Sequence, residues 1–564
     1  MKKLLSVILC LSLLLGYGVM TATAQEEKLT INVATDLHLD QDSWAATTPN
    51  RNELSDTYGH VAKSGHLYSE SKAIITAFLE KAAKDDSKAL LIAGDLSDTG
   101  LESEQILLAE MLRKFEAETG KQVYVVPGNH DVTKNTVSKF AEIFAEFGYN
   151  EAIEKDTNSA SYVAELPDDY RLIAIDSTGF QQGGACIDAA RLEWIRQQAE
   201  KAQKDGKKAI AMLHHNILPH LVLIDLIHPT AVADKNLGLK EMFAQYGVKY
   251  VFTGHSHEND IASYTSPNGE VIYDIETGSM CLYPSVYRTV SFGDDVKIET
   301  KRIESISTEL VPVGISDEAF NLMKTNFTEY TKNCAYIGIE NTLYTNFLNA
   351  DFIKDLIKLD SSADPEMNAL IEKIVPRLET AITMPFNAEN ETTQGESIES
   401  VLKNFKVTTP KSKYNNLASL AVAIYQVHVV GDENMPAYSD EVVLASKGIG
   451  AALAYTLSDV SAEEYALALS YVCKLLDVEM PANFLAFASD KLKRFEGIEL
   501  LVSTAILPLI LKVTVDEAPG DCNVTLPGYA QLIEPPAAEK TFWEKVQDFF
   551  IKIFSFIMSI FAFM

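Results

Sequence analysis

Cysteine is scarce in this chain. Only 6 of the 564 residues are cysteine, and no two of them are spaced as C-x-x-C. Folds that depend on disulfides or on cysteine-bound zinc need more cysteines at closer spacings. The low count therefore excludes a disulfide-dense scaffold and a zinc site made of cysteines. A single bridge stays open among the cysteines that follow Cys10, which are Cys186, Cys281, Cys334, Cys473 and Cys522.

Basic residues are also few. The chain has 48 Lys and Arg against 79 Asp and Glu, which gives a formal net charge of −31. Lys and Arg supply most of the affinity for phosphate backbones, so a nucleic acid is not expected as a partner. Hydrophobic residues at 47% and charged residues at 23% are ordinary for a globular protein. A single core stops growing at roughly 250–300 residues, so we expect two or more domains.

Long apolar runs are confined to the two ends of the chain. Lys2 and Lys3 precede the apolar run Leu4–Leu15, and Ala22-Thr23-Ala24 then gives a small-x-small cleavage pattern. This order predicts that residues 1–24 are a signal peptide and that the protein is secreted or held at the cell surface. An uncleaved anchor is the alternative, but a membrane span needs about 20 apolar residues and this run is shorter. Cleavage would change the net charge to −33.

The other apolar end is a Phe-rich tail over residues 538–564. From Phe549 onward it holds 16 residues with one charge, Lys552. Sixteen helical residues reach about 24 Å, which is short of the roughly 30 Å hydrocarbon core of a bilayer. The tail therefore predicts either a helix lying on a membrane surface, with Trp543 near the headgroups, or a helix packed on the rest of the chain or on a second copy. The oligomeric state stays open.

Histidine is nearly absent from the second half. Ten of the 11 histidines lie at or before His257, and only His428 follows. The first half, in contrast, alternates short apolar runs with helical periodicity, which predicts an α/β layered domain over residues 25–305. The expected strands are 29–34, 89–93, 123–126, 172–175, 209–213, 250–252, 271–275, 286–292 and 296–303. The expected helices are 71–84, 102–119, 137–147, 189–202 and 240–245.

The periodicity changes from Ser316 onward. Helical patterns predict an all-α domain over residues 316–537, with a polar loop at 387–400. A capping-box signature at Ser461–Glu464 marks one helix start. The expected helices are 317–331, 350–358, 365–383, 417–428, 442–457 and 463–476.

Five polar clusters follow predicted strands of the first domain. They are Asp36-Leu37-His38, Gly94-Asp95, Gly128-Asn129-His130-Asp131, His214-His215 and Gly254-His255-Ser256-His257. In open α/β sheets, ligands bind outside the carboxyl ends of the strands, so we expect the clusters to meet in one crevice. Carboxylate, imidazole and amide ligands without a thiolate suit Mn, Fe, Zn or Ni. One carboxylate between two cations can bridge them about 3.5–4 Å apart, as in two-metal hydrolysis.

In this order, the five clusters resemble the calcineurin-like metallophosphoesterases. The resemblance covers residues 29–305 and implies a four-layer α/β/β/α sandwich, here followed by the all-α domain. It implies two divalent or trivalent metal ions, Mn, Fe or Zn, whose identity the sequence does not fix. It implies that Asp36, His38, Asp95 and His257 hold one ion, and that Asp95, Asn129, His214 and His255 hold the other. His130 would lie beside the substrate without binding metal.

Further residues are similar to one branch, the cyclic-nucleotide phosphodiesterase-like members, whose exported bacterial representatives carry a helical C-terminal domain. They are Asp176-Ser-Thr-Gly179, Ile187, Leu192, Trp194 and Thr277-Gly278-Ser279. The family pattern often continues His-His-Pro, whereas Asn216 follows His215 here.

The chemistry that these residues predict is metal-assisted hydrolysis of a small phosphate ester. A hydroxide bridging two cations would attack phosphorus, and His130 would protonate the leaving oxygen as the general acid. We expect a phosphodiesterase acting on cyclic or other small nucleotides. The same ligands would also serve a phosphomonoesterase or protein phosphatase, and a non-catalytic surface binding protein is a third hypothesis.

Residues beside these clusters are not expected to be catalytic. Asp131 would orient His130 or hold the turn, and His215 would lie behind the ligands or at the surface. Asp40 and Asp98 would bond ligating histidines or serve as turn residues. His60, His66 and His220 lie in segments that could form the rim of the site, but a solvated loop is the more common place for such histidines.

Overall fold

The computed structural model describes residues 28–40, 58, 64–179, 185–220, 232–233, 237–311, 315–342, 364–390, 396–409, 411–461, 463–464, 467, 502–503, 507–516 and 518–529. The predicted signal peptide, the Phe-rich tail, the helix expected at 350–358 and most of the one at 463–476 lie outside the described residues, as do His60 and Cys473. Within the described part, no helix combines the length and apolar character that crossing a membrane requires. Cys186, Cys281, Cys334 and Cys522 are free thiols.

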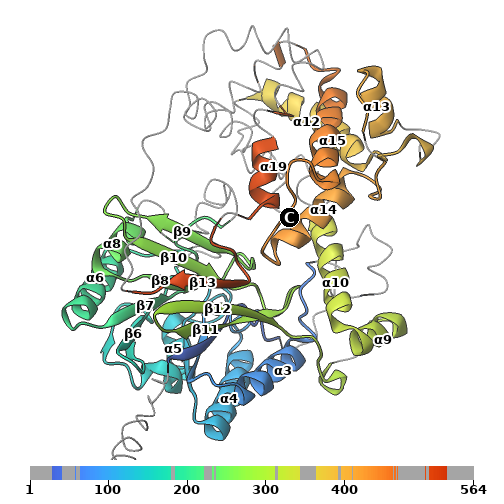
Figure 1. Cartoon of the computed structure of the whole chain (residues 1–564). Helices are drawn as coiled ribbons and strands as arrows, with labels where there is room; N and C mark the ends of the chain where they lie inside the picture. Colours follow the sequence, from blue (N-terminus) through green and yellow to red (C-terminus); the bar gives the residue numbers. More distant parts are fainter. Residues whose placement is uncertain are drawn as a thin grey trace, which may run out of the picture.

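Two mixed sheets form the centre of the first domain (Figure 1). One has the strand order β13-β12-β11-β1-β2-β3, and the other has the order β4-β5-β6-β7-β8-β10-β9. The strands of the first sheet are β1 (Thr30–Ala34), β2 (Ala89–Ile92), β3 (Gln122–Val125), β11 (Val286–Phe292), β12 (Asp295–Arg302) and β13 (Asn523–Pro527). Those of the second are β4 (Glu154–Lys155), β5 (Tyr162–Glu165), β6 (Tyr170–Ala174), β7 (Lys208–Met212), β8 (Tyr250–Thr253), β9 (Ile261–Thr265) and β10 (Val271–Glu276).

The two sheets face each other across an aromatic core. The ring of Phe292 in β11 lies 4.7 Å from that of Tyr170 in β6 and 5.9 Å from that of Tyr250 in β8. Every residue of β2 is buried, which is typical of a parallel strand covered on both faces. The apolar runs that predicted these strands are therefore the inner layers of a sandwich.

Helices cover both outer faces. The helices α3 (Ser71–Lys84), α4 (Glu102–Thr119) and α5 (Val137–Ile143) lie on the first sheet, and α6 (Ala189–Lys204) and α8 (Leu239–Tyr246) lie on the second (Figure 1). Phe78 of α3 packs on Tyr287 of β11 with ring centroids 4.9 Å apart. The predicted four-layer α/β/β/α arrangement is thus confirmed. The helix expected at 137–147 is interrupted, because a π-helical turn follows α5 and Phe147 leaves helical geometry at φ −100° and ψ 69°.

The second half is helical, as predicted. Its helices are α9 (Asp317–Thr325), α10 (Phe327–Thr342), α12 (Pro365–Thr383), α13 (Ile398–Asn404), α14 (Leu417–His428), α15 (Asp440–Leu457) and α19 (Leu507–Thr514). The spans of α12 and α14 agree with the sequence to the residue. The helix expected at 317–331 is divided at Asn326, whose φ of −152° is not helical. Part of the expected loop at 387–400 is the start of α13.

One strand lies within the span for which the sequence predicted only helices. β13 returns to the sandwich and pairs antiparallel with β12, from Asp295 opposite Pro527 to Glu299 opposite Asn523. Its Leu526 is 1% exposed and belongs to the main core. A strand of only five residues that pairs with a distant part of the chain cannot be recognised from local periodicity, so β13 was missed, as were β4, β5 and β9. The end of the described chain is therefore part of the first domain's sheet.

Candidate metal centre

The five polar clusters follow the carboxyl ends of β1, β2, β3, β7 and β8. β1, β2 and β3 are parallel neighbours in one sheet, and β7 and β8 are parallel neighbours in the other. The two groups meet because the backbone N–H of His255 donates to Asp36 Oδ2 at 3.1 Å. Within the first sheet, the N–H of His38 donates to the carbonyl oxygen of Asp95 at 3.0 Å. The expected crevice therefore forms where the two sheets end together.

The backbone at these clusters is unusual. Non-glycine residues rarely adopt a positive φ, and such strain gathers at functional sites. Five of the seven predicted metal ligands adopt it, namely Asp36 (51°), His38 (40°), Asp95 (48°), His255 (78°) and His257 (65°). The motif glycines permit close approach, since a Cβ at Gly128 would lie 2.2 Å from Asp95 Oδ1 and one at Gly254 would lie 2.4 Å from Asp36 Oδ2. The side chains are thus aimed inward by the fold.

One group of predicted ligands converges around Asp36. Its Oδ1 lies 3.2 Å from His257 Nε2 and 3.7 Å from His38 Nε2, and these two nitrogens are 3.3 Å apart. Asp36 is fully buried, and its Oδ1 accepts no hydrogen bond from the described residues. Buried carboxylate oxygens are normally satisfied, so an unpartnered oxygen beside two imidazole nitrogens fits a cation.

The other group converges around His214. Its Nε2 lies 3.0 Å from Asn129 Oδ1 and 3.2 Å from Asp95 Oδ2. His255 lies beside it, with ring centroids 5.1 Å apart. Asp95 Oδ2 is also 4.0 Å from His38 Nε2, so this one oxygen faces both groups. The placement agrees with the bridging role predicted for Asp95, and all seven predicted ligands stand together.

The charges in the site are arranged as imidazole–carboxylate pairs. Burial opposes the charged form of His214, but the Asp95 carboxylate outweighs it and raises the pKa of His214 to about 9. Burial would raise the pKa of Asp95, yet His214 holds that pKa below its ordinary value. Burial and the charge of His214 lower the pKa of His255 to about 3. A cation would therefore displace the proton of His214, as ligand binding by imidazole requires.

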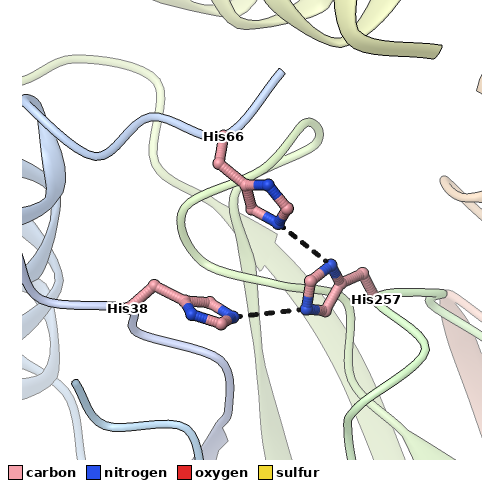
Figure 2. A group of neighbouring side chains, drawn as sticks. All are labelled: His38, His66 and His257. Atoms are coloured by element: carbon pink, nitrogen blue, oxygen red, sulfur yellow. Dashed lines mark hydrogen bonds between the residues drawn. The ribbon is translucent and has the colours of Figure 1, made fainter. Parts of the chain in front are cut away.

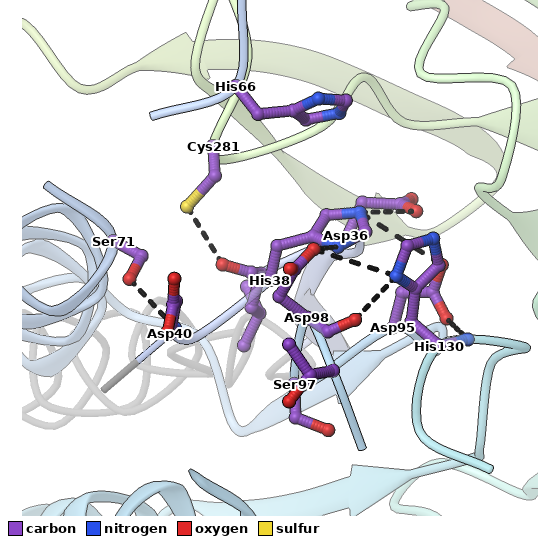
Figure 3. A network of polar contacts seen from close by, with 12 residues as sticks. Asp36, His38, Asp40, His66, Ser71, Asp95, Ser97, Asp98, His130 and Cys281 are labelled. Atoms are coloured by element: carbon purple, nitrogen blue, oxygen red, sulfur yellow. Dashed lines mark hydrogen bonds and ion pairs between the residues drawn. The ribbon is translucent and has the colours of Figure 1, made fainter. Parts of the chain in front are cut away.

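Partners behind the ligands fix their orientation. His214 Nδ1 donates to the carbonyl oxygen of Ala93 at 3.0 Å, which leaves its Nε2 lone pair free for a metal. Asp98 Oδ1 lies 3.2 Å from His38 Nδ1 and supports that ring in the same way (Figure 3). The sequence left Asp98 open between this role and a turn, and the structure shows the ligand contact.

His130 stands at the open side of the site. Its side chain is 40% exposed, whereas those of His38 and His214 are at most 1% exposed. His130 Nδ1 donates to the carbonyl oxygen of Asp98 at 2.6 Å, and its ring lies edge-on to His38 with centroids 4.7 Å apart (Figure 3). Its Nε2 is therefore the nitrogen available to a ligand that enters from solvent.

Asp131 holds the turn. Its carboxylate accepts the backbone N–H groups of Leu96 at 3.1 Å, Ser97 at 2.8 Å and Gly128 at 2.9 Å. Burial and the neighbouring Asp95 raise the pKa of Asp131 to about 6. Of the two roles left open for Asp131, the turn is the one observed, and Asp98 orients His130 instead.

The structure also places three histidines outside the predicted ligand set, and for His215 it selects the position behind the ligands over the surface. His215 is fully buried and its Nδ1 lies 2.8 Å from Ser177 Oγ. His220 is 1% exposed and lies 2.5 Å from Asp260. His66 reaches the metal centre, with Nε2 3.4 Å from His257 Nδ1 (Figure 2). The solvated-loop interpretation was therefore wrong for His66 and His220, and no strand end marked either residue.

The departure at Asn216 has a local reason. Its Nδ2 donates to Thr253 Oγ1 at 3.1 Å and to Glu276 Oε2 at 3.0 Å, and its Oδ1 accepts from Ser256 Oγ at 2.9 Å. The side chain thus ties the loop after β7 to the loop after β8, where a proline could form none of these bonds. The ligand His214 keeps its place.

Comparison with known proteins agrees with this geometry. Residues 29–259 match the model of the calcineurin-like phosphoesterase family, a span that contains all seven predicted ligands and His130. A probable glycerophosphodiester phosphodiesterase of Arcobacter nitrofigilis is 27% identical over 170 residues, 29% of this chain and 55% of that protein. A probable cyclic nucleotide phosphodiesterase of Rhodococcus erythropolis is 27% identical over 223 residues, 37% of this chain and 65% of that protein.

These alignments span less than two thirds of each curated relative. Among solved structures, a dimetal phosphatase from Danio rerio aligns with a TM-score of 0.37 and 12% identity, covering 49% of this chain and 96% of that one.

Proposed function

We propose that this protein hydrolyses small phosphodiesters, cyclic nucleotides among them, at a site for two metal ions, because residues 29–259 match the model of the calcineurin-like phosphoesterase family. The observation that supports the proposal is that the seven predicted ligands form two groups and that Asp95 Oδ2 faces both, 4.0 Å from His38 Nε2 and 3.2 Å from His214 Nε2. The diester preference is supported by the two relatives, whose names are those of phosphodiesterases.

Separate groups of residues would hold the two cations and orient the ligands. Bound cations would neutralise charge on the phosphate and lower the pKa of a water molecule. Asp36, His38, Asp95 and His257 would hold one cation, and Asp95, Asn129, His214 and His255 the other. The fold supplies the preorganisation, because the strained backbone and the partners Ala93 and Asp98 fix the imidazoles before any ligand arrives.

His130 would move the proton. Its Nδ1 is held by the carbonyl oxygen of Asp98, and Asp98 Oδ1 lies 3.5 Å away, so the ring is oriented with Nε2 directed to the entering ligand. Proton donation to the leaving oxygen typically contributes about 10²–10⁴-fold in rate. This contribution depends on the leaving group, since an oxygen that leaves readily as an anion needs little help.

That dependence provides the test. The chain without residues 1–24 is loaded with Mn²⁺ and assayed on bis-p-nitrophenyl phosphate, on p-nitrophenyl phosphate, and on a cyclic nucleotide, whose leaving group is an alkoxide. We expect both diesters to be cleaved faster than the monoester. We expect His130→Ala to slow the cyclic nucleotide by about 10²–10⁴-fold and the nitrophenyl diester by much less, with bound Mn²⁺ unchanged by elemental analysis.

Other outcomes would change the assignment. A preference for the monoester would favour a phosphomonoesterase or protein phosphatase on the same site. Bound Mn²⁺ with no ester cleaved would favour a non-catalytic binding protein. An equal loss on both diesters in His130→Ala would remove the general-acid role while leaving the hydrolase in place.

A further inference from the structure

His66 enters the metal centre from outside the strand-end clusters. It lies between β1 and α3, and its Nε2 is 3.4 Å from His257 Nδ1 (Figure 2). The rings of His66 and His257 are 5.1 Å apart at nearly right angles, and His66 also stacks on Tyr68 at 5.2 Å. One nitrogen from each of His38, His66 and His257 lies within 4.8 Å of the others. His66 is not one of the seven predicted ligands, so its contact with His257 requires a separate explanation.

The orientation of His257 supplies that explanation. His257 Nε2 faces Asp36 Oδ1 at 3.2 Å and is the nitrogen aimed at the metal position. A metal-binding nitrogen must keep its lone pair free, so the ring proton of His257 has to sit on Nδ1. The atom that faces this Nδ1 is His66 Nε2, which would accept the proton in a hydrogen bond. His214 and His38 have equivalent partners in Ala93 and Asp98.

The helical region holds the segment that carries His66. A Cβ on Gly338 of α10 would lie 2.3 Å from the backbone nitrogen of Gly65, so the two backbones touch where only glycine fits. Gly65 itself has a φ of +78°. On the far side of His66, the N–H of Leu67 donates to the carbonyl oxygen of Cys281 at 2.8 Å. The residue is thus fixed from both sides, with α10 forming one of them.

A second contact strengthens this link between the regions. Tyr330 of α10 donates its hydroxyl to Glu70 Oε1 at 2.6 Å, and both residues are fully buried. Glu70 immediately precedes α3 and lies four residues after His66. The segment from Gly65 to Glu70 is therefore packed against α10 at both of its ends.

We propose that His66 is a positioning residue of the metal centre, which holds His257 in the tautomer and orientation that a cation needs, and that α10 seats it there through Gly338. The inference rests on the proposed two-metal site and gives the helical region a part in building it. Partners behind metal ligands typically change metal affinity by about 10–100-fold when they are removed.

The first experiment measures metal binding, not turnover. Calorimetric titration of Mn²⁺ into the metal-free chain is compared for wild type, His66→Leu and His66→Gln. We expect His66→Leu to weaken one of two binding steps by about 10–100-fold. Gln places an amide oxygen near the position of Nε2 and can accept from Nδ1–H, so His66→Gln should recover most of the affinity. Unchanged affinity in His66→Leu, or an equal loss in both variants, would overturn the positioning role.

The second experiment tests α10. Gly338→Ala should push Gly65 and reproduce the loss seen in His66→Leu, and the double variant should bind Mn²⁺ no more weakly than His66→Leu alone. Gly448→Ala in α15 is the matched control, because a methyl group there would meet the end of the Leu417 side chain, which can move. Thermal unfolding checks that each variant is folded. Equal affinities in Gly338→Ala and Gly448→Ala would overturn the part assigned to α10.

These readouts separate the inference from the proposed function. A wild type that binds two Mn²⁺ and cleaves no ester would overturn the hydrolase while the His66 comparison still stands. A wild type that binds no Mn²⁺ would overturn both.

Discussion

Polar side chains at the strand ends of the sandwich and at the helix ends of the helical region are hydrogen-bonded in different ways. In the sandwich, Asp36 Oδ1 and His215 Nε2 are buried at the strand ends without a hydrogen-bond partner among the described residues. In the helical region, Asn416 and Ser439 cap α14 and α15, and Arg377 donates to the carbonyl oxygen of Tyr455 near the end of α15. Helix caps satisfy the backbone groups at helix ends that have no partner within the helix. Unpartnered side-chain atoms where several polar residues converge instead indicate a ligand.

The two regions are nevertheless joined by buried polar contacts. Arg288 of β11 is fully buried and donates to the carbonyl oxygen of Asp521, two residues before β13. The Asp521 carboxylate accepts the N–H of Ile261 in β9 at 2.9 Å and that of Asp432, which follows α14, at 3.1 Å. These hydrogen bonds join the segment that leads into β13 to the sandwich and to the residues that follow α14. We call this contact between the two regions, formed by Arg288, Asp432 and Asp521, the seam.

The largest expected effect is on metal affinity, and it distinguishes the metal centre around Asp95 from the cluster of Asp432, Asp516 and Asp521. Asp95→Asn removes the charge that faces both ligand groups, and we expect Mn²⁺ affinity to fall by more than about 100-fold, beyond the usual range for residues behind a ligand. Asp432→Asn is the control, because Asp432, Asp516 and Asp521 also lie together but without histidine. Calorimetry measures both. Equal losses in the two variants would mean that the helical region holds metal as well.

The sequence was informative about the site because of how parallel strands end. Asp36, Asp95 and Asn129 follow neighbouring strands of one sheet, and His214 and His255 follow neighbouring strands of the other. Order along the chain therefore becomes proximity in space, and no long-range information is needed. The same logic cannot find His66, because the contact between Gly65 and Gly338 joins residues that no local pattern relates. The glycine at position 338 is the one trace that this close approach leaves in the sequence.

In the helical region, the sequence predicted the elements themselves better than the contacts between them. Amphipathic periodicity predicted α12 and α14 correctly, because each helix buries one face regardless of what covers it. It did not predict β13, which is stabilised by pairing with β12 more than 200 residues earlier, nor the break at Asn326. Helix existence is local, whereas helix contacts and strand pairing are not.

The next prediction compares a buried arginine at the seam with one in the helical region. Arg288→Leu would leave the buried carbonyl oxygens of Glu276 and Asp521 without their donor, and at about 1–3 kcal/mol for each we expect a loss of about 2–6 kcal/mol in the free energy of unfolding. Arg377 is 24% exposed and water can replace it, so Arg377→Leu should cost about 1 kcal/mol. Urea unfolding followed by circular dichroism measures both. Similar costs would show that the seam carries no special share of the stability.

The smallest expected effect concerns the pH dependence of the same seam. Burial and the nearby carboxylate of Asp260 raise the pKa of Asp521 to about 8, although backbone N–H groups of Asp432 and Ile261 donate to it. A carboxyl group whose pKa is raised in the folded state stabilises the fold in its protonated form. Its contribution is therefore complete below the ordinary aspartate pKa and is lost as the pH rises through about 8.

Asp521→Asn isolates that contribution. The free energy of unfolding of wild type minus that of the variant should decrease from pH 5 toward pH 8 and level off above it, because only the wild type gains a buried charge. Other titrating groups are common to both proteins and cancel in the difference. Asp516→Asn is the matched control, since Asp516 lies in the same cluster without accepting the two seam N–H groups. A difference that stays constant across this range, or that increases with pH, would show that Asp521 is already ionised at the seam and that its hydrogen bonds outweigh its burial.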